Sequence, residues 1–269
     1  MPPPKKRLGQ HFLHDPRILR RIADAATIQP GDTVLEIGPG PGGLTRELAA
    51  QGAGAGPARL VVIEKDRDMV PGLREQFPRV SVIEGDALEL DWHRLTGPGP
   101  VRIVGNIPYN ITSPLLERAL LPPRPAVIVF LVQQEVADRV AAARGGPDYG
   151  ALSVGVQAVA RVERLFRVPA GAFRPRPKVD SAVLRLTPLS LPLVEDGEVP
   201  AFRRFVVGLF GFRRKQLIRG LRELTGAGAP EVARWLALAG VAESDRPQAL
   251  DPASFARLFR AVPPLQRPA

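Results

Sequence analysis

The sequence contains no cysteine, which excludes disulfide bonds and thiolate metal sites. Histidine is also scarce, and His11 and His14 have no cluster of carboxylates beside them, so we expect no metal site. No apolar run is long enough to span a membrane, and the N-terminal residues lack the apolar core of a signal peptide. These absences predict a cytoplasmic protein with no membrane partner.

Acidic residues are the minority among the charged ones, with 27 Asp and Glu against 37 Lys and Arg, which gives a net charge of +10. Because neutralising phosphates releases counterions, this excess favours a polyanionic partner such as a nucleic acid. The alternative is ordinary surface charge in a composition that is biased towards arginine. With 269 residues, 45% of them hydrophobic, the chain is predicted to be globular, with one large and one small domain.

The most informative stretch is Gly-Asn-Ile-Pro-Tyr-Asn at 105–110, which follows the run 101–104, apolar apart from Arg102. A short β-branched run closed by Gly, Asn and Pro indicates the end of a buried strand. Ligands of doubly wound α/β domains bind at the carboxyl ends of strands. The stretch therefore predicts an amide, a rigid turn and an aromatic ring beside a ligand. The alternative is a strand-ending turn with a packed tyrosine.

These residue types suit methylation of the exocyclic amine of a base such as adenine. The lone pair of that amine is delocalised into the ring, so the nitrogen is a poor nucleophile. The side-chain oxygen of Asn106 can accept a hydrogen bond from the amine, and the carbonyl of Ile107 is a second expected acceptor because Pro108 holds the turn rigid. Two acceptors favour a pyramidal nitrogen, while Tyr109 can stack on the base.

The loop after the predicted strand 33–37 has two interpretations. Gly38, Gly40 and Gly43 satisfy the dinucleotide pattern G-x-G-x-x-G, with Glu64 about where a dehydrogenase would bind ribose. However, Glu36 places a carboxylate at the strand end, and the prolines at 39 and 41 stiffen the loop. S-adenosylmethionine has no pyrophosphate but carries a cationic sulfonium and an amino group, so these features favour it as the cofactor.

Several motifs occur together in the order and at the spacing of one family. They are Gly9-Gln10-His11-Phe12-Leu13, Glu36-Ile37-Gly38-Pro39-Gly40-Pro41-Gly42, Glu64-Lys65-Asp66, Gly85-Asp86-Ala87, Asn106-Ile107-Pro108-Tyr109 and the segment 173–181. In this combination the sequence closely resembles the ribosomal RNA adenine dimethyltransferases, and most closely their small-subunit branch. The resemblance implies an S-adenosylmethionine-dependent enzyme that dimethylates N6 of two adjacent adenosines near the 3′ end of 16S rRNA during ribosome biogenesis. Its implied partner is that rRNA in the 30S subunit or its precursor, and we expect a monomer.

The resemblance also implies an architecture, a class I (Rossmann-like) α/β domain with a seven-stranded, mostly parallel sheet. We expect this domain, with its basic N-terminal arm, at 1–189, and a small all-α domain that contacts rRNA at 190–269. Within the sheet, 151–160 and 181–186 are the expected sixth and seventh strands.

Roles for individual residues follow from the same resemblance. The expected cofactor-binding residues are His11, Leu13, Glu36, Gly38, Gly40, Gly42, Glu64, Lys65, Asp86, Ala87 and Asn106. The expected catalytic residues are Asn106, Ile107, Pro108, Tyr109 and Phe173, with Phe173 packed on the flipped adenine opposite Tyr109. The expected RNA-binding residues are Arg174, Arg176 and Lys178 on a proline-rich loop and Arg213, Arg214 and Lys215 on a helix.

Alternatives stay open for several of these interpretations. Phe173 can instead be buried in the core, Glu64 can be a surface acid paired with Lys65 or Arg67, and the basic runs can be solvated surface. A large-subunit methyltransferase that confers antibiotic resistance has the same core, and a non-catalytic assembly factor can have the same fold. A nucleotide-dependent dehydrogenase is the remaining alternative.

Overall fold

The computed structural model describes residues 3–5, 8–51 and 59–264. Met1, Pro2, Lys6 and Arg7 of the predicted basic arm lie outside the described residues. The chain divides into two compact units, one made of 1–137 and 162–188 and the other of 138–161 and 189–269. The predicted single boundary at 189 differs from this division, because helix α7 (Ala151–Gln157) packs against the C-terminal helices.

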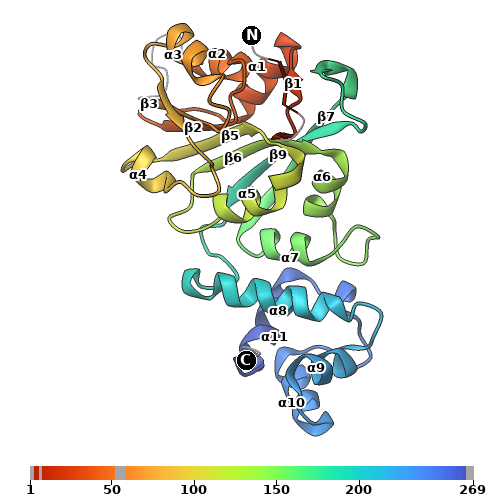
Figure 1. Cartoon of the computed structure of the whole chain (residues 1–269). Helices are drawn as coiled ribbons and strands as arrows, with labels where there is room; N and C mark the ends of the chain where they lie inside the picture. The colour runs from red at the N-terminus through yellow and green to blue at the C-terminus, as the bar shows by residue number, and fades with distance from the viewer. Residues whose placement is uncertain (1–2, 6–7, 52–58, 265–269) are drawn as a thin grey trace. The chain divides into compact units, whose positions relative to one another are not determined.

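The first unit is built on a seven-stranded sheet with the order β4-β3-β2-β5-β6-β9-β7 (Figure 1). The strands are β2 (Thr33–Ile37), β3 (Arg59–Glu64), β4 (Ser81–Glu84), β5 (Val101–Asn106), β6 (Val127–Gln133), β7 (Ala160–Val168) and β9 (Ser181–Pro188). The pairs from β4 to β6 are parallel, and β9 is antiparallel to β6. The predicted mostly parallel, seven-stranded sheet is therefore confirmed.

Helices cover both faces of this sheet, which explains the continuous apolar runs of its central strands. Figure 1 shows α1 (Pro16–Ala25), α2 (Gly43–Ala50) and α3 (Val70–Gln76) on one side and α5 (Thr112–Ala119) on the other. The short helix α4 (Trp92–Thr96) contacts β2, and α6 (Gln134–Ala141) follows β6. α1 begins as the sequence predicts, because Asp15 accepts a hydrogen bond from the Arg17 N–H and Pro16 occupies the first turn.

A second, two-stranded sheet joins the N-terminal arm to the loop that follows β7. β1 (Phe12–Leu13) pairs antiparallel with β8 (Phe173–Arg174), and Leu13 lies opposite Phe173. The N-terminal arm is defined here as residues 3–5 and 8–13. This pairing brings together two motifs that lie far apart in the sequence.

The second unit is helical. It contains α7, α8 (Val199–Gly211), α9 (Leu217–Thr225), α10 (Ala229–Ala239) and α11 (Pro252–Ala261). The predicted strand at 151–160 is wrong, since this run forms α7, where the Gly150 N–H donates to Ser153 Oγ at 3.0 Å. A short apolar run does not distinguish a buried helix from a strand. Among the helices described, none is long and apolar enough to cross a membrane.

Candidate active site

The carboxyl ends of four parallel strands meet at one edge of the sheet. β2 ends at Ile37, β3 at Glu64, β4 at Glu84 and β5 at Asn106. Their parallel register brings the loops that follow to the same place, where ligands of doubly wound domains bind. A cavity lies there, and the N-terminal arm forms part of its wall.

Most of the predicted site residues line this cavity. They are His11, Gly38, Gly40, Glu64, Lys65, Asp86, Ala87, Asn106, Ile107, Pro108 and Tyr109. The lining also includes residues that were not predicted as site residues: Leu8, Gly9, Gln10, Phe12, Ile37, Ile63, Gly85, Asn110 and Ile111. Gly9, Gln10, Phe12, Ile37 and Gly85 are detectable in the sequence by their place inside the motifs, whereas Leu8 and Ile63 carry no signal of their own.

The N-terminal arm orients Asn106. The Nδ2 atom of Asn106 donates a hydrogen bond to the backbone carbonyl oxygen of His11 at 2.8 Å. Because a carbonyl oxygen can only accept, this contact requires the amide nitrogen to face His11 and the amide oxygen to face away from it. The side-chain oxygen therefore remains as the acceptor that Asn106 offers to a ligand in the cavity.

Tyr109 lies directly after Pro108, whose φ of −55° and ψ of 132° set the turn. The Tyr109 hydroxyl is hydrogen-bonded to Ser181 Oγ at 2.8 Å, and burial raises the pKa of Tyr109. The His11 ring stacks on the tyrosine ring, with the centroids 5.4 Å apart and the planes at 23°. His11 Nδ1 lies 2.7 Å from the carbonyl oxygen of Pro175, so it acts there as the donor. These contacts fix the aromatic wall of the cavity.

Glu64 is held by backbone donors on both sides. Its Oε2 accepts from the Gly40 N–H at 2.9 Å and its Oε1 from the Asp66 N–H at 2.7 Å. Burial raises the pKa of Glu64, although these two N–H groups act in the opposite direction. Glu64 is therefore no surface acid: it is 5% exposed, and its carboxylate is fixed in the cavity wall.

Asp86 forms an ion pair with Lys65 at the next strand end. Lys65 Nζ donates to Asp86 Oδ2 at 2.5 Å, and the Leu88 N–H donates to Asp86 Oδ1 at 2.9 Å. Partial burial acts to raise the pKa of Asp86, but the hydrogen bonds from Lys65 and Leu88 outweigh it, so the pKa is lowered. This carboxylate is kept ionised at the cavity.

Glu36, Leu13 and Gly42 do not line the cavity, which corrects their predicted contact with a cofactor. Glu36 is 1% exposed and accepts a hydrogen bond from Thr45 Oγ1 at 2.7 Å, and burial raises its pKa to about 8. It is therefore a neutral carboxyl group at pH 7, not a counter-charge. Leu13 belongs to the hydrophobic core. Gly42 precedes α2 with φ 84°, and a Cβ there would lie 2.5 Å from the ring of Phe77.

Phe173 is also absent from the cavity wall, so the predicted packing on a base opposite Tyr109 does not correspond to this structure. Its side chain is 2% exposed and lies in the hydrophobic core. The physical reason is strand alternation: β8 buries Phe173 and exposes Arg174. The ring that faces Tyr109 is that of His11.

The predicted RNA-binding residues form two separate groups. Arg174, Arg176 and Lys178 are exposed in the first unit. Arg213, Arg214 and Lys215 are exposed in the second unit, in the turn between α8 and α9 and not on a helix as predicted. Lys215 forms an ion pair with Glu223. In the part of the chain that the structure describes, no group of His, Cys, Asp or Glu is arranged to hold a metal ion.

The strand order, the antiparallel β9 and the glycine-lined cavity at the strand ends define a class I S-adenosylmethionine-dependent methyltransferase. A family model described as ribosomal RNA adenine dimethylase matches residues 3–262. The chain belongs to this ribosomal RNA adenine dimethylase family, and the dehydrogenase alternative is therefore wrong.

Individual relatives agree with this assignment. The chain is 40% identical to the ribosomal RNA small subunit methyltransferase A of Maridesulfovibrio salexigens, over 96% of this chain and 95% of the relative. It is 43% identical to the protein of that name from Pseudomonas aeruginosa, over 94% and 92%. Among solved structures, a dimethyladenosine transferase from Plasmodium falciparum is 26% identical with a TM-score of 0.76, over 92% of this chain and 96% of that one. The 23S rRNA methyltransferase ErmE is 29% identical with a TM-score of 0.71, over 93% and 98%.

Proposed function

We propose that this chain dimethylates N6 of two adjacent adenosines near the 3′ end of 16S rRNA, as a cytoplasmic monomer acting on the small ribosomal subunit or its precursor. Relatives named for the small subunit are 40% to 43% identical to it. The 23S rRNA enzyme of similar fold is 29% identical. This difference in identity favours the small-subunit substrate over the large-subunit alternative.

The residues of the cavity fit S-adenosylmethionine. Glu64 and Asp86 carry carboxylates that suit its ribose hydroxyls and its adenine amine, and the Ala87 N–H is the proposed donor to the ring; all three residues line the cavity. Gly40 lies with φ 54°, and a Cβ there would lie 2.9 Å from the ring of Phe12, so glycine suits the close packing of this loop against the N-terminal arm. When bound, S-adenosylmethionine supplies an electrophilic methyl group on a sulfonium.

The observation that carries the proposal is the fixed orientation of the Asn106 amide. With its nitrogen committed to His11, Asn106 can accept from the target amine only through its side-chain oxygen. The carbonyl of Ile107 is the proposed second acceptor, and Pro108 keeps the turn rigid. Tyr109 holds the flipped base by stacking.

The chemistry then needs no side-chain base. The two acceptors would hold the amine with its lone pair directed at the methyl group of a bound cofactor. As the new N–C bond forms, the sulfonium S–C bond would break and the neutral thioether would leave, and the cationic amine would be acidic enough to lose its proton to water. A second transfer to the same nitrogen requires cofactor exchange and follows the same geometry. Arg174, Arg176 and Lys178, together with Arg213, Arg214 and Lys215, are proposed to contact the rRNA backbone.

The test offers radiolabelled S-adenosylmethionine with unmethylated 30S particles, naked 16S rRNA and 50S particles. We expect dimethyladenosine from the 30S sample alone. Asn106→Ala should abolish transfer while calorimetry still detects binding of S-adenosylmethionine. Label in 50S particles, or full activity of the Asn106 variant, would contradict the proposal.

A further inference from the structure

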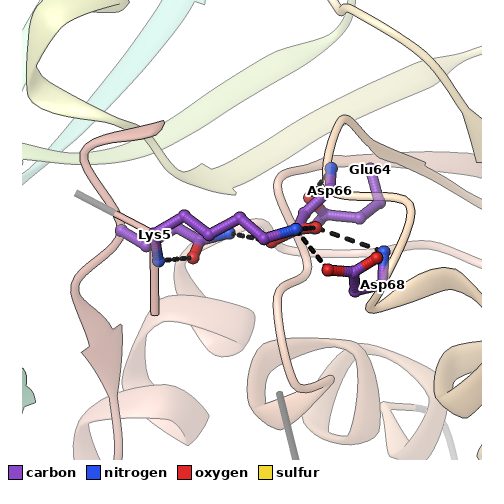
Figure 2. Close-up of polar contacts among 5 residues, drawn as sticks. Lys5, Glu64, Asp66 and Asp68 are labelled. Carbon is purple, nitrogen blue, oxygen red and sulfur yellow. Dashed lines mark hydrogen bonds and ion pairs between the residues drawn. The ribbon is translucent and has the colours of Figure 1, made fainter. Parts of the chain in front are cut away.

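Asp66 joins the N-terminal arm to the loop after β3, as Figure 2 shows. Lys5 Nζ donates to Asp66 Oδ1 at 2.5 Å, and Gln10 Nε2 donates to Asp66 Oδ2 at 2.9 Å. The Lys5 N–H also donates to Gln10 Oε1 at 2.6 Å. Asp66 is 1% exposed. Each oxygen of this buried carboxylate therefore accepts a hydrogen bond from a side chain of the arm, Oδ1 from Lys5 and Oδ2 from Gln10.

The same aspartate is connected to the cavity. Its backbone N–H donates to Glu64 Oε1, and the other oxygen of Glu64 accepts from Gly40. Asp66 therefore makes two kinds of contact. Its side chain binds the N-terminal arm, and its backbone N–H binds the Glu64 carboxylate in the cavity wall. Asp68, whose side chain is 50% exposed, also accepts from Lys5 at 2.5 Å.

Between its two attachments the arm forms one wall of the cavity. Residues 8–12 line it, and beyond them the arm is held by the β1–β8 pairing. Without the Asp66 contacts, the start of this wall would keep only one described link to the loop after β3, the exposed Lys5–Asp68 pair, whereas its end would stay fixed by the Asn106–His11 hydrogen bond and the β1–β8 pairing. Binding of a ligand would then have to supply the free energy for ordering the start of the wall.

We infer that Asp66 is a positioning residue that keeps the N-terminal arm closed on the cavity through Lys5 and Gln10, and thereby sets the affinity for the cofactor. This role rests on the proposed function, in which the cavity binds S-adenosylmethionine. Because binding couplings are reciprocal, the bound cofactor should in turn stabilise the arm.

The ionisation of Asp66 agrees with this role. Burial acts to raise its pKa, but the hydrogen bonds from Lys5 and Gln10 and from the Asp68 N–H outweigh burial, so its pKa is lowered. The carboxylate is therefore charged at pH 7. The hydrogen bonds to Asp66 and Asp68 raise the pKa of Lys5, which keeps the ammonium charged as well.

The test compares Lys5→Gln, Lys5→Arg, Asp66→Asn and the double variant Lys5→Gln/Asp66→Asn with the wild type. Arg20→Gln is the matched control, because Arg20 of α1 forms its ion pair with Glu47 of α2, in the same unit but outside the arm. Calorimetry gives the Kd for S-adenosylmethionine, and hydrogen exchange gives the protection of residues 8–13 with and without it. Steady-state rates on 30S particles give KM for the cofactor and kcat.

We expect Lys5→Gln and Asp66→Asn each to raise the Kd about tenfold, since charge-assisted hydrogen bonds are among the strong ones. The double variant should lose less affinity than the sum of the two single losses, because both changes remove the Lys5–Asp66 ion pair. Lys5→Arg and Arg20→Gln should stay near the wild type. In ligand-free protein, residues 8–13 should exchange faster in the Lys5→Gln variant, and KM should rise while kcat stays the same.

An unchanged Kd and unchanged arm exchange in Lys5→Gln would overturn the inference even if Asp66→Asn loses affinity, because Lys5 lies on the arm and not in the loop. A wild type that binds no S-adenosylmethionine would instead refute the proposed function. In that case hydrogen exchange of the ligand-free variants still decides whether Asp66 holds the arm.

Discussion

Glu36 allows a quantitative prediction, because it is a buried acid with a simple environment. Replacing it by glutamine keeps the size of the side chain and leaves a carbonyl that can accept from Thr45, but removes the titrating group. Burial, which is the largest influence, raises the pKa of Glu36 from 4.5 to about 8. The Thr45 hydroxyl lowers it, and the charge of Glu64 raises it.

The sign of the pH dependence follows from proton counting. Between pH 4.5 and about 8 the folded state keeps the Glu36 proton, whereas the unfolded state has lost it. The free energy of unfolding that Glu36 contributes is therefore largest below pH 4.5 and falls as the pH rises through about 8. Since one pKa unit corresponds to about 1.4 kcal/mol, the loss over this window is roughly 4–5 kcal/mol.

Glu36→Gln should remove this loss. Urea unfolding at pH values from about 5.5 to about 9.5 gives the difference in the free energy of unfolding between variant and wild type. We expect the free energy of unfolding of the variant to rise relative to that of the wild type by about 1.4 kcal/mol for each pH unit up to about pH 8. Above that pH the difference between the two proteins should stay constant.

Thr45→Val provides the second arm of this experiment. It removes the hydroxyl that lowers the pKa of Glu36, so the pH dependence should extend to higher pH than in the wild type. A difference between Glu36→Gln and wild type that does not vary with pH would show that Glu36 is ionised in the folded protein, and the reasoning would be wrong.

Three further predictions concern stability and are checked by the urea midpoint. Phe173→Ala should lower the free energy of unfolding by about 3–5 kcal/mol, because the ring is 2% exposed in the core. A loss of turnover without a loss of stability would contradict the place of Phe173 in the core. Gly105→Ala should destabilise by roughly 1–3 kcal/mol, since a Cβ would lie 2.7 Å from the carbonyl oxygen of Ile37; an unchanged midpoint would mean that the strands can separate. Asp32→Asn should cost about 3–5 kcal/mol by leaving Arg102, buried and paired with Asp32, without its counter-charge; a neutral effect would show that water reaches this pair.

The ends of two central strands could be predicted from the order of the amino acids alone. Largely apolar runs that end before Gly or at Asn predicted β2 and β5, because parallel strands buried on both faces are mostly apolar. The predicted place of Asn106 beside a ligand follows from this, since ligands bind at the carboxyl ends of parallel strands. The roles expected of Glu64 and Asp86 came from the family resemblance. The local pattern is sufficient there because position along a strand fixes position in the sheet.

The direction in which other side chains face depends on how distant parts of the chain pack together. Phe173 and Glu36 were predicted to contact a ligand, yet strand pairing and helix packing bury both. The apolar run 151–160 is compatible with either a helix or a strand. Its contacts with α8 and α11 favour the helix α7. The contacts of Asp66 with Lys5 and Gln10 join residues more than 50 positions apart. No local pattern encodes such contacts, because they depend on the path of the whole chain.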